Sequence, residues 1–260
     1  RHDLRILVID LDPKASSTMF LDHTHSIGSI LETAAQAMLN DLDAETLRKE
    51  VIRPTIVPGV DVIPASIDDG FVASQWKELV EEHLPGQNQY EILRRNIIDR
   101  VADDYDFIFI DTGPHLDPFL LNGLAASDLL LTPTPPAQVD FHSTLKYLTR
   151  LPEMLEQLED EGVVPRLSAS IGFMSKMTGK RDHETSHSLA REVYASNILD
   201  SSLPRLDGFE RCGESFDTVI SANPQSYPGS AEALKKARTE AERFTKAVFD
   251  RIEFVRGEAA

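Results

Sequence analysis

The chain has 260 residues with a formal net charge of −17, and its 41% hydrophobic and 27% charged content is typical of a globular protein. Such an acidic chain is disfavoured as a general binder of nucleic acid, so any DNA contact would require a local basic patch. The single cysteine, Cys212, excludes an intrachain disulfide framework and indicates the reducing cytoplasm, and no apolar run is long enough to span a membrane.

An apolar strand followed by two acidic residues opens the sequence. Residues 5–9 (RILVI) predict a buried parallel strand, and Asp10 and Asp12 follow at its carboxyl end, where open α/β sheets bind ligands. Two carboxylates there suit Mg²⁺ binding or the positioning of water beside a nucleotide. The sequence holds no Gly-rich phosphate loop and begins at Arg1, so we expect a segment of the protein to be missing upstream. Without that segment, tight ATP binding is not expected.

Helical patterns and apolar runs alternate along the rest of the chain. The predicted elements are a polar helix over 33–50, a helix over 90–101, a strand over 106–110 that ends in Asp111 and the turn Gly113–Pro114, a strand over 129–133 that prolines interrupt, a helix over 141–158, a strand over 168–174 and a helix over 231–255. This alternation predicts an α/β fold with a mostly parallel sheet and helices on both faces. We find no domain linker.

The second acidic strand end, Asp111, has two interpretations. An aspartate after a strand commonly caps the following helix, and for one residue considered alone that interpretation is preferred. Acidic residues at the ends of two strands of one sheet instead favour the metal-holding half of a phosphate-transfer site.

Four motifs in order carry a resemblance to a known family. Residues 8–13 (VIDLDP) resemble the second nucleotide motif of the ParA/MinD group of deviant Walker ATPases, and residues 107–114 (FIFIDTGP) resemble its Walker B strand. Residues 58–66 (PGVDVIPAS) and 131–135 (LTPTP) are similar to further ParA segments. The likeness runs from Leu4 to the end of the chain. It is closest to the large plasmid-partition ParA proteins of phage-plasmids, which carry a DNA-binding region before the ATPase domain.

The resemblance implies a P-loop NTPase-like fold that lacks its first strand and phosphate loop here, with residues 1–260 forming one ATPase domain, incomplete at its N-terminus. It implies that Asp12 positions or activates the hydrolytic water, that Asp111 reaches Mg²⁺, usually through water, and that Asp10 supports the metal site. Lys14 stands where the family usually has glutamine, which leaves the details of hydrolysis open.

The resemblance also implies that Lys176, Pro204 and Arg205 bind the nucleotide base, although such residues equally suit surface turns. His183 and His187 are four residues apart and could form a metal pair, but with no third ligand in evidence a surface role is favoured.

Basic residues gather at the start of the last predicted helix. Lys235, Lys236 and Arg238 lie off its apolar stripe, and from the sequence alone a solvated helix face with a Lys236–Glu240 pair is preferred. The resemblance favours DNA binding instead, because partition ATPases of this type bind nonspecific DNA through basic residues near the carboxyl end. Arg211 is a further candidate.

The function implied is that of a partition ATPase in the cytoplasm, associated with the nucleoid and not with a membrane. It would bind ATP or ADP with Mg²⁺, form a homodimer, bind nonspecific DNA, and hydrolyse ATP under stimulation by a ParB-type centromere-binding partner. One alternative is a MinD-like membrane-associated positioning ATPase, although residues 254–260 are short and mixed in charge. The other is a nucleotide-free interaction or repressor fragment, suggested by the missing phosphate loop.

Overall fold

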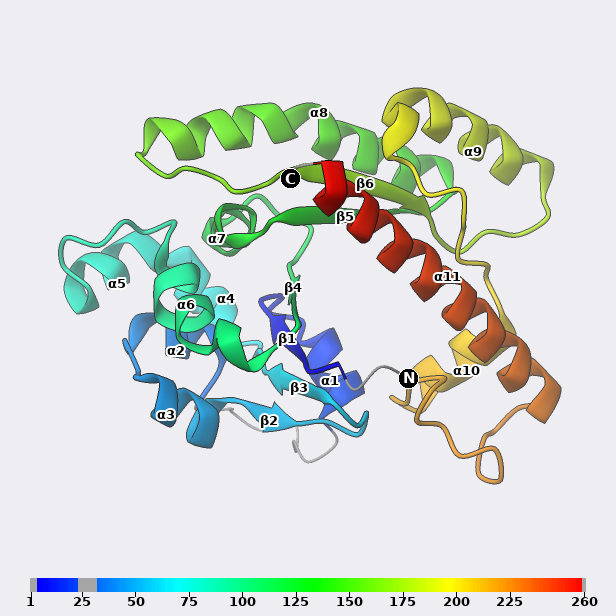
Figure 1. Cartoon of the computed structure of the whole chain (residues 1–260), viewed down its shortest axis with the longest axis horizontal. Helices are drawn as coiled ribbons and strands as arrows, with labels where there is room; N and C mark the ends of the chain where they lie inside the picture. Colours follow the sequence, from blue (N-terminus) through cyan, green and yellow to red (C-terminus); the bar gives the residue numbers. More distant parts are fainter. Residues whose placement is uncertain (1–3, 23–31, 259–260) are drawn as a thin grey trace. The chain divides into compact units, whose positions relative to one another are not determined.

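The computed structural model describes residues 4–22 and 32–258, which form two compact units (Figure 1). Unit 1 comprises Arg1–Ser127 and Leu155–Arg166, and unit 2 comprises Asp128–Met154 and Leu167–Ala260. The elements of unit 1 are β1 (Ile6–Asp10), α1 (Ser16–Leu21), α2 (Ala34–Leu39), α3 (Ala44–Thr46), η1 (Leu47–Val51), β2 (Arg53–Pro54), β3 (Val60–Ile63), α4 (Asp69–Ser74), α5 (Trp76–His83), η2 (Arg94–Ile98), α6 (Asp99–Val101), η3 (Ala102–Asp104), β4 (Phe107–Asp111) and α7 (Pro118–Ala126). Those of unit 2 are β5 (Leu129–Thr134), β6 (Ala169–Met174), α9 (Arg181–Tyr194), η4 (Ala195–Asn197), α10 (Asp207–Glu214) and α11 (Ala231–Glu258), while α8 (Gln138–Asp160) begins in unit 2 and ends in unit 1.

The sheet of unit 1 has the strand order β2-β3-β1-β4. β1 runs parallel to both β3 and β4, and only the short β2 is antiparallel. The register places Asp10 of β1 opposite Asp111 of β4. Because parallel strands end at the same edge of a sheet, the loops after β1, β3 and β4 all leave from that edge.

The core of unit 1 covers one face of this sheet. Leu7 and Ile9 of β1 are fully buried against helical residues of α2, α5, η2 and α7. Trp76 of α5 packs edge-on against Phe119 of α7, with ring centroids 5.6 Å apart. On the opposite face Val8 is half-buried and Phe109 is 36% exposed. Alternation along a strand explains this division, because successive side chains point to opposite faces.

The sheet of unit 2 is covered on both faces. β5 and β6 are parallel, and Figure 1 shows α8 and α9 on one side of the pair and α11 on the other. Met174 of β6 packs in a buried cluster with Phe141 of α8 and Tyr194 of α9. Its neighbour Phe173 points the other way, and its ring lies 4.7 Å from that of Phe244 in α11. The predicted α/β architecture is thereby confirmed.

Three predicted elements differ in detail. The helix expected over 33–50 is divided into α2, α3 and η1, because Asp41 has a positive φ of 48° and Asp43 starts a new helix by accepting a hydrogen bond from the Thr46 N–H. The helix expected from Tyr90 begins later and contains the π-helical turn η2. β5 includes Pro133, as predicted, and extends one residue further, to Thr134. Among the described strands it pairs only with β6, and an edge strand tolerates a missing N–H.

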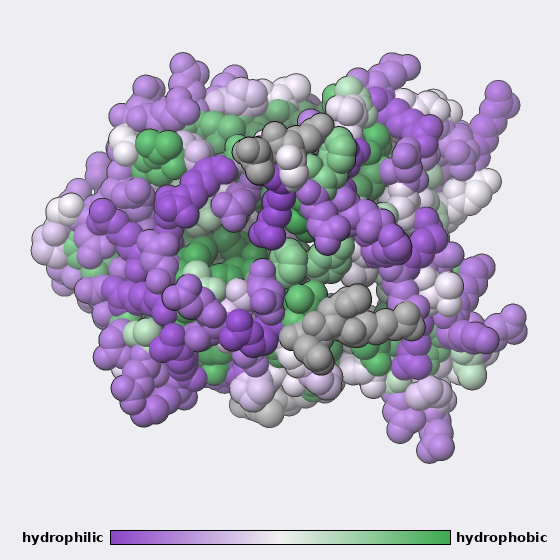
Figure 2. Space-filling model, viewed as in Figure 1, coloured by the Kyte–Doolittle hydropathy of each residue, from purple (hydrophilic) through white to green (hydrophobic). Residues whose placement is uncertain are grey.

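The face of the molecule shown in Figure 2 is largely hydrophilic. No helix within residues 4–22 and 32–258 has the length and apolar character needed to cross a membrane.

Close packing of α10 on α11 generates the first prediction. A Cβ added at Gly208 would lie 2.5 Å from the Ala237 Cβ and 2.6 Å from the Ala233 carbonyl oxygen. Gly208→Ala should therefore lower the free energy of unfolding by about 1–3 kcal/mol, measured by urea denaturation. Gly179→Ala is the control, since nothing lies within 4 Å of its added Cβ. Equal stabilities of the two variants would contradict this packing.

Candidate functional site

Asp10 is the buried centre of the acidic strand ends. Its side chain is fully buried, its Oδ1 accepts a hydrogen bond from the Asp12 N–H at 3.1 Å, and its Oδ2 accepts two from Thr18, from the N–H and from Oγ1, each at 2.8 Å. Burial raises the pKa of Asp10 to about 6 because it disfavours the charged form, and the nearby Asp111 raises it further, whereas the Thr18 hydrogen bonds lower it. Both carboxylate oxygens of Asp10 thus accept hydrogen bonds from the protein, so Asp10 is placed to hold neighbouring residues of the site in position.

Asp12 lies on the loop between β1 and α1. Its carboxylate is partly exposed, and its Oδ1 accepts a hydrogen bond from the Lys14 N–H at 3.1 Å. Its carbonyl accepts one from the Ala15 N–H at 2.7 Å, and Ala15 has the left-handed φ of 54° that starts α1. A Cβ at Gly113 would be 3.3 Å from Asp12 Oδ1, so the loop after β4 also borders this carboxylate.

Asp111 ends β4 and is exposed. Its Oδ2 accepts a hydrogen bond of 2.5 Å from Ser17 Oγ at the start of α1. The structure therefore brings Asp10, Asp12 and Asp111 to one edge of the sheet, as the positions of the two strand ends predicted. Their roles remain predictions.

Asp12 and Asp111 are accessible to water, but the three aspartates do not form a complete metal site. Within residues 4–22 and 32–258 there is no cluster of three or more His, Cys, Asp or Glu side chains that could hold a metal ion. A Mg²⁺ ion near Asp111 would take most of its ligands from phosphate oxygens and water, and one of those water molecules could bridge the ion to Asp111. The histidine pair His183–His187, for which a surface role was favoured, gains no third ligand among the described residues either, and His183 Nδ1 accepts a hydrogen bond of 3.1 Å from the Thr178 N–H.

Sequence reasoning missed Ser17, Thr18 and Gly113 as members of this site. The sequence signal was weak: Ser17 and Thr18 follow the acidic end of the first strand, and Gly113 follows the acidic end of the second. Each contact depends on the pairing of β1 with β4 or on the fold of the loop, which no local pattern reveals.

In unit 2, the predicted base-binding residues lie together. Lys176 is exposed, with a positive φ of 54°, just beyond β6. A parallel bridge joins Met177 to Pro204, and the Arg205 N–H donates to the Met177 carbonyl at 2.8 Å. The two segments are thus neighbours. The side chain of Arg205 forms an ion pair with Glu210 at 2.5 Å, and binding of a base by these residues stays a prediction.

The candidate DNA-binding residues of unit 2 are two lysines and two arginines, which differ in whether they have partners in the protein. Lys235 and Lys236 are exposed and form no ion pair within the described part of the chain. The expected Lys236–Glu240 pair is wrong, because Arg243 takes Glu240 at 2.7 Å.

The two arginine candidates instead have protein partners. Arg238 donates to the Val219 carbonyl at 2.5 Å and to the Ala222 carbonyl at 2.6 Å. The Arg211 Nε donates to both oxygens of Asp207, at 2.9 and 3.0 Å. Lys235 and Lys236 are therefore the better placed to bind an anion.

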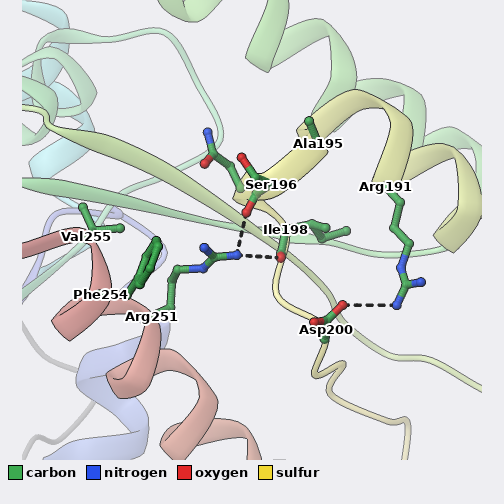
Figure 3. Close-up of a pocket in the computed structure, with 9 residues that line it drawn as sticks. Arg191, Ala195, Ser196, Ile198, Asp200, Arg251, Phe254 and Val255 are labelled. Carbon is green, nitrogen blue, oxygen red and sulfur yellow. Dashed lines mark hydrogen bonds and ion pairs between the residues drawn. The ribbon is translucent and has the colours of Figure 1, made fainter. Parts of the chain in front are cut away.

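A separate pocket lies between η4 and the end of α11 (Figure 3). Arg251 donates to the carbonyls of Ser196 and Ile198, at 2.5 and 3.3 Å, and its guanidinium lies 5.7 Å from the centre of the Phe254 ring. Arg251 thus ties the end of α11 to the segment after α9. None of the predicted site residues lines this pocket.

The chain matches a family model described as an AAA domain over residues 1–163, more than half of its length. The chain belongs to this family. Plasmid partition protein A of Escherichia coli is 63% identical over 255 residues, an alignment that covers 98% of this chain and 64% of the relative. A solved structure described as a partition protein is 85% identical, with a TM-score of 0.83, and the match covers 99% of this chain and 66% of that one. The resemblance to ParA-type partition ATPases is confirmed.

The fold extends to more distant structures. Cobyrinic acid a,c-diamide synthase of Mycobacterium smegmatis, solved with bound ADP and magnesium, has a TM-score of 0.60 at 20% identity, and the match covers 78% of this chain and 75% of the synthase. That likeness confirms the P-loop NTPase-like fold alone. The chain spans slightly less than two thirds of the length of the two partition proteins described above.

The burial of Asp10 makes folding stability depend on pH. Because its folded pKa of about 6 exceeds the ordinary value of 3.8, the folded protein holds this proton more tightly than the unfolded chain. The associated stability is complete below pH 3.8 and is lost as the pH rises through about 6. In metal-free protein, the stability of the wild type relative to Asp10→Asn should fall by roughly 2–3 kcal/mol between pH 4 and pH 7. Urea denaturation at several pH values measures this, and a constant difference would contradict the burial of a charge here.

Proposed function

We propose that this chain is the larger part of the ATPase region of a ParA-type plasmid partition protein, and that the complete protein hydrolyses ATP with Mg²⁺. The observation that carries the proposal is the parallel pairing of β1 with β4, which sets Asp10 opposite Asp111 with Asp12 on the adjoining loop. Family membership supplies the reaction class. The geometry supports a different role for each of the three carboxylates.

Each carboxylate would act in its own way. Asp111 would bind Mg²⁺, through a water molecule, because it is exposed and, among the described residues, only one of its two carboxylate oxygens, Oδ2, accepts a hydrogen bond. When bound, Mg²⁺ would neutralise charge on the phosphates. Asp12, partly exposed beside Gly113, would orient the attacking water and accept its proton. Asp10 would hold the Asp12 backbone in place through the 3.1 Å hydrogen bond.

The phosphate-binding loop would come from a part of the complete protein other than these 260 residues. Among the described strands β4 pairs only with β1, so its second edge is open although its sequence is strongly apolar. Apolar strands of parallel sheets are usually paired and covered on both sides. A further parallel strand at β4 would deliver its following loop to the edge that carries Asp10 and Asp111.

Titration with labelled ADP should accordingly show tight binding by the complete protein and weak binding by residues 1–260 alone.

DNA binding is the second part of the proposal. Lys235 and Lys236, together with Arg211 and Arg238, would bind DNA phosphates without regard to sequence in an ATP-bound homodimer. The two exposed lysines support this role because no acidic partner in the described part of the chain neutralises them. A ParB-type partner would stimulate hydrolysis and thereby release the DNA. The protein would then act in the cytoplasm on the nucleoid.

Replacement of Asp12 tests the catalytic assignment. In the complete protein, Asp12→Ala should retain ATP binding but lower kcat by about 10²–10⁴-fold, because the water loses its positioning group. Steady-state phosphate release and binding of labelled ATP separate the two effects. Asp160→Ala, at an exposed position at the end of α8, should behave as the wild type. Undiminished turnover in Asp12→Ala would refute the assignment.

Removal of the two free lysines tests the DNA assignment. The double variant Lys235→Ala/Lys236→Ala should weaken binding to random duplex DNA and flatten the slope of log affinity against log salt by about 1.8, since each phosphate contact contributes about 0.9. Lys246→Ala is the matched control on the same helix, because Lys246 is already paired with Asp250 at 2.6 Å. A double variant with wild-type affinity and slope would show only a solvated helix face. Arg211 would then be the next residue to test.

A further inference from the structure

Two consecutive hydroxyl residues at the start of α1 each contact a different acidic strand end. Ser17 Oγ donates to Asp111 Oδ2 at 2.5 Å, and Thr18 Oγ1 donates to Asp10 Oδ2 at 2.8 Å. The carboxylates belong to neighbouring strands and lie opposite each other in the register of β1 and β4. The short helix α1 therefore forms hydrogen bonds with the acidic residues at the ends of both β1 and β4. Ser16, the preceding residue, is exposed and makes neither contact.

The orientation of the Thr18 hydroxyl follows from its partners. Thr18 is 2% exposed, and its Oγ1 accepts a hydrogen bond of 2.9 Å from the Ala65 N–H, just beyond β3. Because a backbone N–H can only donate, the hydroxyl proton of Thr18 is left for Asp10. The Thr18 N–H donates to the same Asp10 oxygen at 2.8 Å. The carboxylate of Asp10 is thus held between the ends of β1 and β3.

This hold extends to the proposed catalytic residue. The other oxygen of Asp10 accepts the Asp12 N–H, so a rotation of the Asp10 carboxylate would move the backbone that carries Asp12. Ser17 acts on the exposed Asp111 in a simpler way. Its hydroxyl fixes one carboxylate oxygen and thereby the direction of the other.

We propose that Ser17 and Thr18 are positioning residues of the ATPase reaction: Thr18 orients Asp12 through Asp10, and Ser17 orients Asp111 toward the metal. The inference rests on the proposed function and adds two residues to it. Groups that orient a metal ligand through a hydrogen bond typically contribute 10–100-fold to metal affinity or activity.

A merely structural role would give a different result. Neither hydroxyl caps α1, whose N-cap residue is Ala15 and which has no side-chain cap. If the hydroxyls only stabilised the fold, their loss would lower the unfolding temperature while the folded enzyme kept its kcat and its Mg²⁺ requirement. Rescue by a residue that restores the hydroxyl separates the two roles at Thr18.

The experiment uses the complete protein with four substitutions. Thr18→Val removes the hydroxyl at nearly constant shape, Thr18→Ser retains it, Ser17→Ala removes the other hydroxyl, and Ser16→Ala is the matched control. Steady-state ATPase assays give kcat, KM for ATP and the Mg²⁺ concentration for half-maximal rate, and circular dichroism confirms folding. Thr18→Val should lose about 10–100-fold in kcat with KM unchanged, and Thr18→Ser should recover most of it. Ser17→Ala should raise the half-maximal Mg²⁺ concentration about tenfold, and Ser16→Ala should match the wild type.

The outcomes are distinguishable. Wild-type kcat in Thr18→Val, an equal loss in Thr18→Ser, or wild-type Mg²⁺ dependence in Ser17→Ala would overturn the proposal while leaving the proposed function intact. An inactive wild-type protein would overturn both. If Thr18→Val does not fold, Ser17→Ala decides the matter, because Ser17 is only half-buried.

Discussion

The parallel pairing of β1 with β4 is the constraint on which the candidate site depends. It places two carboxylates, Asp10 and Asp111, directly opposite each other at the end of the sheet. Burial of Asp10 disfavours its charged form and raises its pKa to about 6, and the negative charge of the neighbouring Asp111 adds to the effect. The fold offsets this cost with three hydrogen bonds to Asp10, two of them from Thr18. The charged form of Asp10 is therefore disfavoured by its surroundings and stabilised by the hydrogen bonds from Thr18 in α1.

The three carboxylates at this edge of the sheet differ in their access to water. Asp10 has no free oxygen and is closed to water, whereas Asp111 is exposed and Asp12 is partly exposed. A metal ion and a water molecule therefore have access to two of the three carboxylates. The distribution of cations in unit 2 follows a similar logic, because its arginine candidates bind protein groups while two lysines remain exposed. A chain with a net charge of −17 can thus still expose two neighbouring positive charges.

The sequence predicted the parts of the fold that local patterns determine. The runs ILVI and FIFI are continuous and apolar, so β1 and β4 could be located, and the acidic residues at their ends followed. The contact between Ser17 and Asp111 joins residues 94 positions apart, and nothing near either residue indicates it. The spacing of Lys236 and Glu240 predicted an ion pair between them. In the structure Glu240 instead pairs with Arg243, three residues further along the helix. The roles of the site residues came from the family resemblance, since an acidic strand end alone does not distinguish a helix cap from a metal ligand.

The most direct test of the account is to locate the metal. Crystals of the complete protein grown with a nucleotide and Mn²⁺, which replaces Mg²⁺ at oxygen sites, give the ion's position from anomalous diffraction. We expect a peak about 4–5 Å from the Asp111 carboxylate, the distance of a ligand that acts through one water molecule. A nucleotide-bound Mn²⁺ ion that lay away from the carboxyl ends of β1 and β4 would contradict it.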